Sequence, residues 1–99
     1  MADVVEVPAE PSRLVLRLYV AGNAANSLRA VSNARALCDT EFPLLYDLEI
    51  VDLLEHPLRA LADRIIVTPT LLRLSPPPAA RAIGDLSDAA SVLLVMAGR

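Results

Sequence analysis

Residues 64–85 read RIIVTPTLLRLSPPPAARAIGD, and they decide how the second half of the chain can fold. Two apolar runs, residues 65–67 and 71–74, flank Pro69. Proline lacks an amide hydrogen and disfavours a helical conformation of the residue before it, so Pro69 is predicted to stand at the start of a strand. The prolines at residues 76–78 then predict an extended, exposed turn.

The first half of the chain predicts a strand followed by a helix. Residues 13–20 (RLVLRLYV) form a nearly continuous apolar run, as expected of a strand covered on both faces. Asn26 or Ser27 is predicted to cap the helix through its side-chain oxygen. Apolar residues then recur at spacings of three and four until Pro43, which marks the end of the helix.

Residues 44–51 alternate between apolar and acidic side chains, which predicts a half-buried strand near the edge of a sheet. Residues 52–63 predict a short helix with Pro57 in its first turn. The order strand, helix, strand, helix, strand indicates an α/β fold in which the first two strands are parallel. Together with a Thr-Pro-Thr step before a later strand, it indicates a thioredoxin-like layout.

The C-terminal segment fits two structures. Ser87 can cap a helix that continues to Gly98, which suits a helix end. Residues 91–96 (SVLLVM) are also short, apolar and partly β-branched, as a strand would be. Periodicity does not separate the two, and we favour the helix.

Composition argues against several classes of function. The chain has 99 residues, a net charge of −3, no lysine and 3% aromatic residues. A nucleic-acid-binding face normally carries a basic excess, and readers of single-stranded RNA need stacking aromatics, so no nucleic-acid partner is expected. No run reaches the roughly 18–20 apolar residues that span a bilayer. The acidic, proline-containing N-terminus is unlike a secretion signal, so we expect a cytoplasmic protein away from the membrane.

The residues that usually carry chemistry are scarce. Cys38 and His56 are the single cysteine and the single histidine, which leaves no disulfide and no thiolate or two-histidine metal site. The turn at residues 21–27 lacks the Cys-x-x-Cys of thioredoxin-like oxidoreductases. No phosphate-binding loop and no serine-histidine-aspartate arrangement is supported. We therefore expect a binding module without cofactors, not an enzyme.

Four separated motifs then match one family. They are LRLYVAGNAANS at residues 16–27, IVDLLEHP at 50–57, TPTLLRLSPPP at 68–78 and IGDLS at 83–87. In this order, and over residues 14–96 without obvious gaps, the chain closely resembles the KaiB family of bacterial circadian-clock proteins. Four motifs in order are far more specific than any one of them.

The resemblance implies a fold and a partner. KaiB proteins are non-enzymatic partners of KaiC, a hexameric ATPase, and they bind its N-terminal ATPase ring. The state that binds KaiC is a monomer with a thioredoxin-like βαβαββα sandwich. A second state is a homotetramer in which the C-terminal half is rebuilt into a βαββααβ fold. The ambiguous residues Ser91, Val92, Val95 and Met96 lie in the rebuilt half, and we expect the monomer to dominate.

The sequence also departs from the clock proteins. Arg64 and Arg73 replace frequent lysines and keep their charge, whereas Asp47 and Glu49 stand where cyanobacterial members are neutral or basic. These acids argue against binding of KaiA, the partner that KaiB sequesters in a full clock. We expect a divergent or non-clock homologue. The alternative function is a free-standing stress or sensory module, related to the KaiB-like sensor domains of histidine kinase pathways.

Two further expectations complete the interpretation. Residues 1–12 are predicted to be a flexible N-terminal arm, and residues 13–99 a single domain. Partner binding is predicted to use exposed arginines beside the proline-rich turn, namely Arg64, Arg73 and Arg81, whose guanidinium groups can pair with carboxylates on an acidic face.

Overall fold

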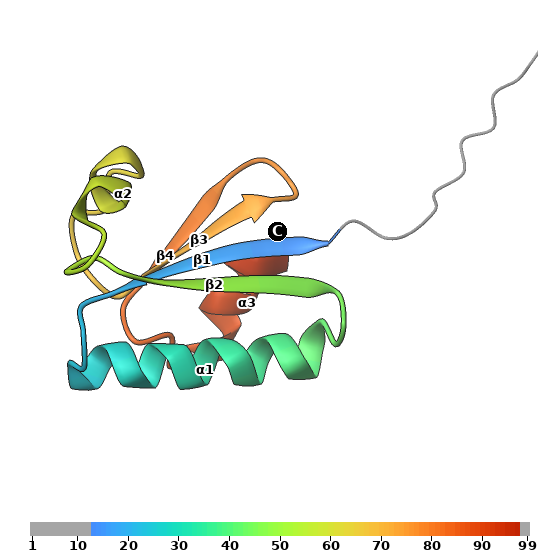
Figure 1. The fold of residues 1–99 in the computed structure, drawn as a ribbon. Helices are drawn as coiled ribbons and strands as arrows, with labels where there is room; N and C mark the ends of the chain where they lie inside the picture. The colour runs from blue at the N-terminus through green and yellow to red at the C-terminus, as the bar shows by residue number, and fades with distance from the viewer. Residues whose placement is uncertain (1–12, 98–99) are drawn as a thin grey trace, which may run out of the picture.

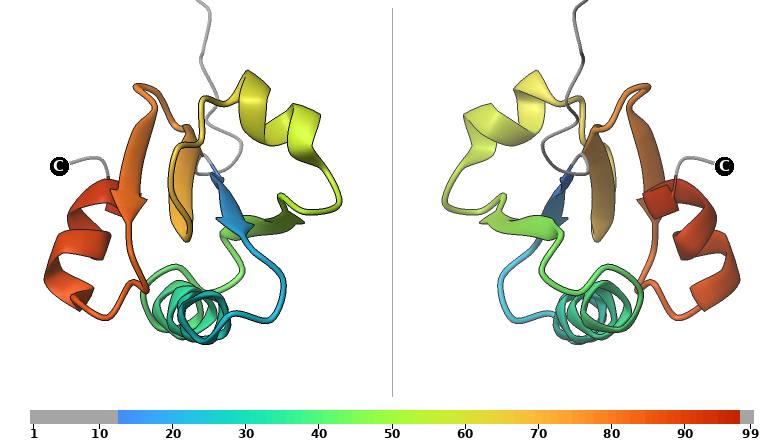
Figure 2. Two further views of the ribbon diagram at one scale, coloured as in Figure 1. Left: turned by 90° about the vertical axis from the view of Figure 1, so that its left-hand side faces the viewer. Right: turned by 90° about the vertical axis from the view of Figure 1, so that its right-hand side faces the viewer.

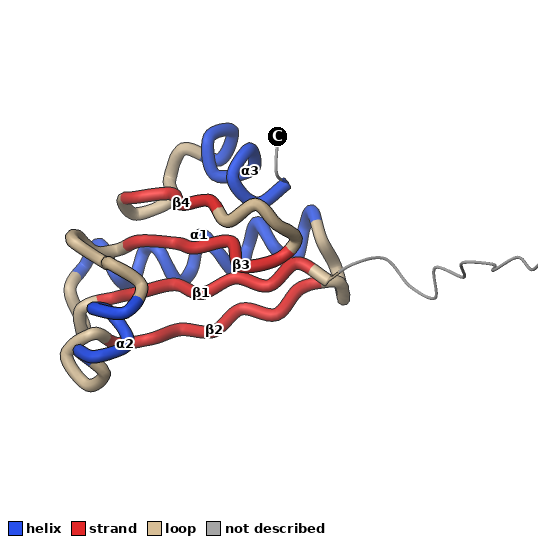
Figure 3. The backbone as a smooth tube through the Cα atoms, turned by 90° about the horizontal axis from the view of Figure 1, so that it is seen from above, coloured by secondary structure: helices blue, strands red, loops and turns tan. Residues whose placement is uncertain are grey.

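The sheet is organised around β1 (Leu14–Val20) in a computed structural model that describes residues 13–97. β1 pairs in parallel with β2 (Tyr46–Asp52) and antiparallel with β3 (Thr70–Ser75). β4 (Ala80–Ile83) pairs antiparallel with β3, which gives the order β2-β1-β3-β4 (Figure 3). The parallel first pair and the edge position of β2 were both predicted. The predicted arm at residues 1–12 lies outside the described residues.

The helices divide unequally between the two faces of the sheet. α1 (Ala25–Glu41) and α3 (Ala89–Ala97) lie on one face, and α2 (Pro57–Ala62) lies on the other (Figures 1 and 2). Along the chain, the elements follow the predicted order βαβαββα. No helix within residues 13–97 is both long and apolar enough to cross a membrane.

The alternation of β1 supplies a core on each face, because successive side chains of a strand point to opposite sides. Leu16 and Leu18 belong to the larger core, which also contains residues of α1 and α3. Tyr19 belongs to a smaller core that it shares with Val51, Ala60 and Leu72. The prediction that β1 is covered on both faces is confirmed.

Helix α1 begins two residues earlier than a cap at Asn26 allows. Ala24 precedes it and makes no side-chain cap, so neither Asn26 nor Ser27 caps the helix as predicted. Ser27 is instead buried in the first turn, where its Oγ accepts a hydrogen bond from the Ala21 amide at 3.0 Å. The hydroxyl therefore fixes the turn before the helix.

Helix α2 is shorter than predicted, because Asp52 still belongs to β2. The Asp52 carboxylate accepts hydrogen bonds from the amides of Gly22 (3.1 Å) and Leu54 (2.9 Å), and so closes the turn after the strand. The helix starts at Pro57, as suits a residue that has no amide to satisfy.

Of the two apolar runs that flank Pro69, only the second forms a strand. Residues 65–67 form an irregular connection, and β3 begins at Thr70, directly after Pro69, as predicted. The Pro69 carbonyl accepts a hydrogen bond from Gly84 at 3.0 Å. The Thr70 hydroxyl donates to the Val67 carbonyl at 2.6 Å. These bonds fix the entry into the strand.

The C-terminal segment is helical, so the favoured interpretation of residues 91–96 is confirmed. Its cap is Asp88 rather than the predicted Ser87. Asp88 Oδ1 accepts a hydrogen bond from the Ser91 amide at 3.3 Å, and Oδ2 accepts one from the Ser91 hydroxyl at 2.8 Å. Ser87 stands one residue too early to reach the free amides of the first turn.

We predict that Asp88→Ala lowers the free energy of unfolding by about 1 kcal/mol, the usual cost of removing a helix cap. Urea denaturation at neutral pH measures the change. Ser87→Ala is the matched control and should leave stability nearly unchanged. A larger loss in Ser87→Ala than in Asp88→Ala would contradict the assignment of the cap.

Candidate functional site

A polar network holds α2 on the sheet. It consists of Arg17 and Tyr19 on β1, Glu49 on β2, and Arg59 and Asp63 at α2. Glu49 lies between two guanidinium groups: Arg17 Nε is 2.8 Å from Oε1, and Arg59 reaches both carboxylate oxygens at 2.8 Å. Asp63 Oδ2 accepts from Arg17 Nη1 at 2.9 Å and from the Tyr19 hydroxyl at 2.6 Å.

The network shifts the pKa values of its members. Hydrogen bonds from Arg59 and then Arg17 lower the pKa of Glu49 from 4.5 to about 2. The Tyr19 hydroxyl and the Arg17 guanidinium lower the pKa of Asp63. Burial, and then the hydrogen bond to Asp63, raise the pKa of Tyr19. Both carboxyl groups are therefore ionised and Tyr19 is neutral at physiological pH.

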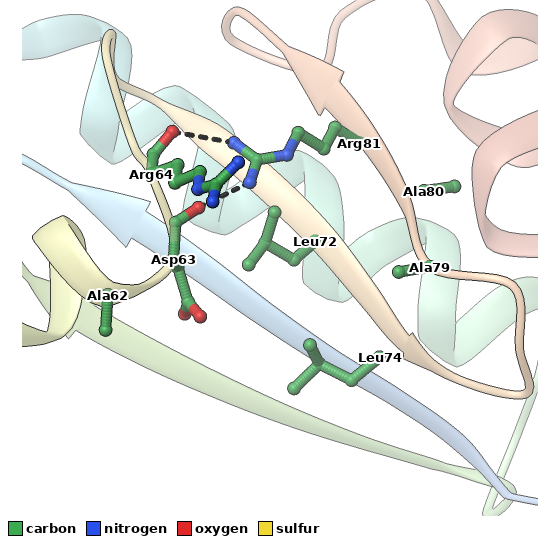
Figure 4. Close-up of a pocket in the computed structure, with 8 residues that line it drawn as sticks. All are labelled: Ala62, Asp63, Arg64, Leu72, Leu74, Ala79, Ala80 and Arg81. Atoms are coloured by element: carbon green, nitrogen blue, oxygen red, sulfur yellow. Dashed lines mark hydrogen bonds between the residues drawn. The ribbon is translucent and has the colours of Figure 1, made fainter.

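A groove of about 260 Å³ lies beside α2 (Figure 4). Leu72 and Leu74 of β3 line it between the end of α2 and β4. The Arg81 guanidinium donates to the carbonyl of Arg64 at 3.0 Å and to that of Asp63. These carbonyls follow the last turn of α2, where a cation is favourable. Arg81 therefore joins β4 to the end of α2.

Two of the three predicted arginines, Arg64 and Arg81, line this groove. Arg64 is exposed, and its side chain makes no hydrogen bond or ion pair with any residue from 13 to 97. Its backbone has a φ of 56°, which turns the chain out of α2. Arg64 is thus the cation of this rim that is free to contact a partner.

The prediction that Arg73 is exposed is wrong, because its exposed fraction is 3%. Its guanidinium donates to the carbonyls of Pro76 (2.8 Å) and Pro78 (2.7 Å), and its Nε has no partner among the described residues. A planar fork of donors suits two carbonyls of one loop. Arg73 therefore organises the proline-rich turn from inside.

Large aliphatic side chains point to solvent around α2. We call Leu54, Leu58, Leu61 and Ile66 the α2 surface; their exposed fractions are 68%, 77%, 71% and 91%. Single exposed aliphatics are ordinary, but four within thirteen consecutive residues are characteristic of a contact surface. The helix buries Ala60 instead, which lets it approach the sheet closely.

The four predicted fold-switch residues all lie on α3. Val92 and Met96 are buried in the larger core, and Val95 is half-buried. Ser91 and Val95 line a second groove of about 360 Å³ between β4 and α3. The structure therefore does not bring these residues together with the arginines of the first groove, apart from Arg81, which borders both.

The thiol and the potential metal ligands of the described residues are not arranged as a reactive site. Burial raises the pKa of the Cys38 thiol to about 11, so the thiolate needed for redox chemistry is scarce at neutral pH. Within residues 13–97, no group of three or more histidine, cysteine, aspartate or glutamate side chains could hold a metal ion. The arrangement is suited to binding a macromolecular surface.

Sequence reasoning missed the α2 surface and the polar network. Leu58 and Leu61 are three residues apart, which is the spacing of a buried helix face, so the pattern alone places them in the core. The acids of β2 were predicted as the polar face of an edge strand and as a departure from relatives, without any ion-pair partner. Glu49 pairs with Arg17 and Arg59, which are 32 and 10 residues away from it, and this pairing needs the tertiary fold.

The chain matches known proteins over most of its length. The family model described as the KaiB domain matches residues 17–97. The circadian clock oscillator protein KaiB of Synechococcus sp. strain CC9311 is 49% identical over 80 residues, which cover 81% of this chain and 67% of that protein.

Solved structures match in fold. The N-terminal domain of SasA from Synechococcus elongatus has a TM-score of 0.75 at 20% identity, covering 99% of this chain and 96% of that one. The germline-specific thioredoxin Deadhead of Drosophila melanogaster has a TM-score of 0.69 at 15% identity, covering 88% and 81%. The predicted thioredoxin-like fold is thereby confirmed.

We predict that the contribution of Glu49 to stability disappears in acid. Its pKa is about 2 in the folded protein and near 4.5 when unfolded, so the unfolded state binds more protons between these values. The stabilisation is complete above about pH 4.5 and is lost as the pH falls through about 2. The stability difference between wild type and Glu49→Gln should therefore shrink with falling pH.

Urea denaturation across this pH range measures that difference. Glu41→Gln is the control, since Glu41 is an exposed carboxylate on α1 without an ion pair among residues 13–97. A difference for Glu49→Gln that stays constant from pH 5 down to about 2 would show that its carboxylate is not stabilised by the network.

Proposed function

The chain belongs to the KaiB family, and from this premise we propose that it is a KaiB-type clock regulator that docks on the N-terminal ATPase ring of a KaiC-like hexamer. Docking would modulate the ATPase and phosphorylation cycle of that hexamer. The protein itself catalyses no reaction in this proposal. The burial of Cys38, which raises the pKa of its thiol to about 11, supports that part.

The α2 surface is the observation that carries the docking proposal. Four exposed aliphatic side chains lie on and around α2, and the groove at the end of this helix has Arg64 on its rim. Interfaces draw most of their binding energy from a few anchor residues surrounded by weaker contacts. Leu58 and Leu61 are the proposed apolar anchors, and Arg64 the proposed partner of an acidic group on the ring.

The predicted arginines take different roles in this proposal. Arg64 contacts the partner directly, and Arg81 holds the carbonyls at the end of α2 while it borders the groove. Arg73 stays outside the contact because it is buried. Pro69 positions the start of β3 through the hydrogen bond of its carbonyl with Gly84.

We further propose that the thioredoxin-like monomer is the binding-competent state, and that a second fold of the C-terminal half remains accessible. Val92, Val95 and the adjacent leucines are good strand formers even though they lie in α3. Two packings of one sequence need differ by only a few kcal/mol for both to matter. A homotetramer would be the other state.

Binding of KaiA is not part of the proposal. Asp47 and Glu49 of the edge strand β2 form ion pairs with Arg13, Arg17 and Arg59. The alternative function is a free-standing sensory module of a histidine kinase pathway, and its partner would differ from that of a clock regulator. Binding to a KaiC ring separates it from the clock-regulator proposal.

We predict that Leu58→Ser/Leu61→Ser and, separately, Arg64→Glu weaken binding to a KaiC hexamer by about 30-fold or more, as expected when interface anchors are removed. Analytical size exclusion and biolayer interferometry with the purified ring measure the affinity. Leu28→Ser/Arg35→Glu, which changes exposed residues of α1 on the other face, is the matched control. Equal affinity of all variants would overturn the assignment of the surface.

We predict helical backbone chemical shifts at Ser91, Val92, Val95 and Met96, together with a monomeric mass in solution. The Asp88 cap and the burial of Val92 and Met96 favour this state. Triple-resonance NMR with multi-angle light scattering measures both properties. Strand-type shifts with a tetrameric mass would show that the other fold dominates.

A further inference from the structure

We propose that the α2 segment, residues 54–68, opens as a unit from the folded sheet, and that Glu49 sets how often it does so. The rest of the fold stays closed during this opening. Opening exposes the sheet face beneath α2 and disperses the α2 surface. The opening itself is a property of the isolated chain, and only its effect on docking rests on the proposed function.

The segment is anchored to the sheet by backbone hydrogen bonds at its two ends, and between them it is attached by side chains alone. The Leu53 amide donates to the Val20 carbonyl at 2.9 Å, and the Pro69 carbonyl accepts from Gly84 at 3.0 Å. Among the described residues, the backbone-to-backbone hydrogen bonds of residues 54–68 stay within the segment or go to Asp52. Its other attachments to the sheet are made by side chains, and its carbonyls accept hydrogen bonds from those of Tyr19, Thr70 and Arg81. No ladder has to break when the segment lifts off β1, β3 or β4.

The apolar contact beneath the segment is thin. Its core contains Tyr19, Val51, Ala60 and Leu72, with Leu53 and Ile65 packed against it. Ala60 is the one fully buried apolar residue that residues 54–68 contribute. The larger core on the opposite face has eleven buried members. Regions with few buried apolar contacts open at lower free energy than the whole protein unfolds.

Polar contacts supply the remaining attachment, and Glu49 is central to them. It binds Arg59 of α2 through both oxygens and also binds Arg17, whose other nitrogen reaches Asp63. Removing the Glu49 charge therefore loosens Arg59 directly and Arg17 indirectly. The side chains of Glu49 and Arg59 are 46% and 39% exposed, so salt screens their pair.

Asp47 provides a matched comparison on the same strand. It lies two residues from Glu49, and its carboxylate binds Arg13 Nε at 2.9 Å and Nη2 at 3.0 Å. The Asp47 pair is thus also bidentate and exposed, but it joins β2 to the residue before β1. Changing Asp47 alters a similar ion pair without touching the α2 segment.

Native-state hydrogen exchange by NMR tests the proposal on the full chain. The reporters are the amides of Ala60, Asp63 and Ile65, which donate within the segment, and those of Ala34 and Cys38 in α1. In wild type the segment amides should exchange faster than the α1 amides. Glu49→Gln should speed the segment amides by about three- to tenfold and leave the α1 amides unchanged. Asp47→Asn should leave the segment amides unchanged.

Three results would overturn the proposal: equal protection of both sets of amides in wild type, equal effects of Glu49→Gln on both sets, or equal effects of Glu49→Gln and Asp47→Asn on the segment. If Glu49→Gln does not fold, the same exchange rates are measured on the wild-type protein while sodium chloride is raised from about 0.05 to 1 M. Selective acceleration of the segment amides supports the proposal, and unchanged relative rates refute it. Loss of KaiC binding alone would bear on the proposed function only.

Discussion

β1 is the element on which the rest of the structure depends, because it is paired along both edges and packed on both faces. Its alternation places Leu16 and Leu18 under α1 and α3, and Arg17 and Tyr19 under α2. A shift of one residue in its register would exchange these two sets. The position of each helix therefore follows from the pairing of one strand.

The two faces that β1 separates are built differently, and this difference organises the function that we propose. The 17 residues of α1 cover one face with an apolar core, whereas the six residues of α2 are held on the other face mainly by charged groups. A helix this short buries little, so its leucines remain available to a partner. The thinly covered face is also the one that can open locally.

Arginine side chains link separate segments of the fold by hydrogen bonds and ion pairs. Arg17 and Arg59 share the Glu49 carboxylate, Arg73 binds two carbonyls of the proline-rich turn, and Arg81 binds two carbonyls after α2. Each of the four uses more than one nitrogen, which the planar guanidinium allows and an ammonium on a flexible stem does not match. Arg64 differs from these four because its side chain makes no hydrogen bond or ion pair within residues 13–97.

The sequence by itself determined the order of the elements, the parallel pairing of the first two strands and the family, because these follow from local periodicity and from motifs along the chain. It also located Pro57 and Pro69 at element starts. The tertiary structure alone decided that Arg73 is buried, that Asp88 caps α3, and that Leu58 and Leu61 face solvent. These properties depend on what lies opposite each residue in space, and a helical or alternating pattern specifies a face without specifying its neighbour.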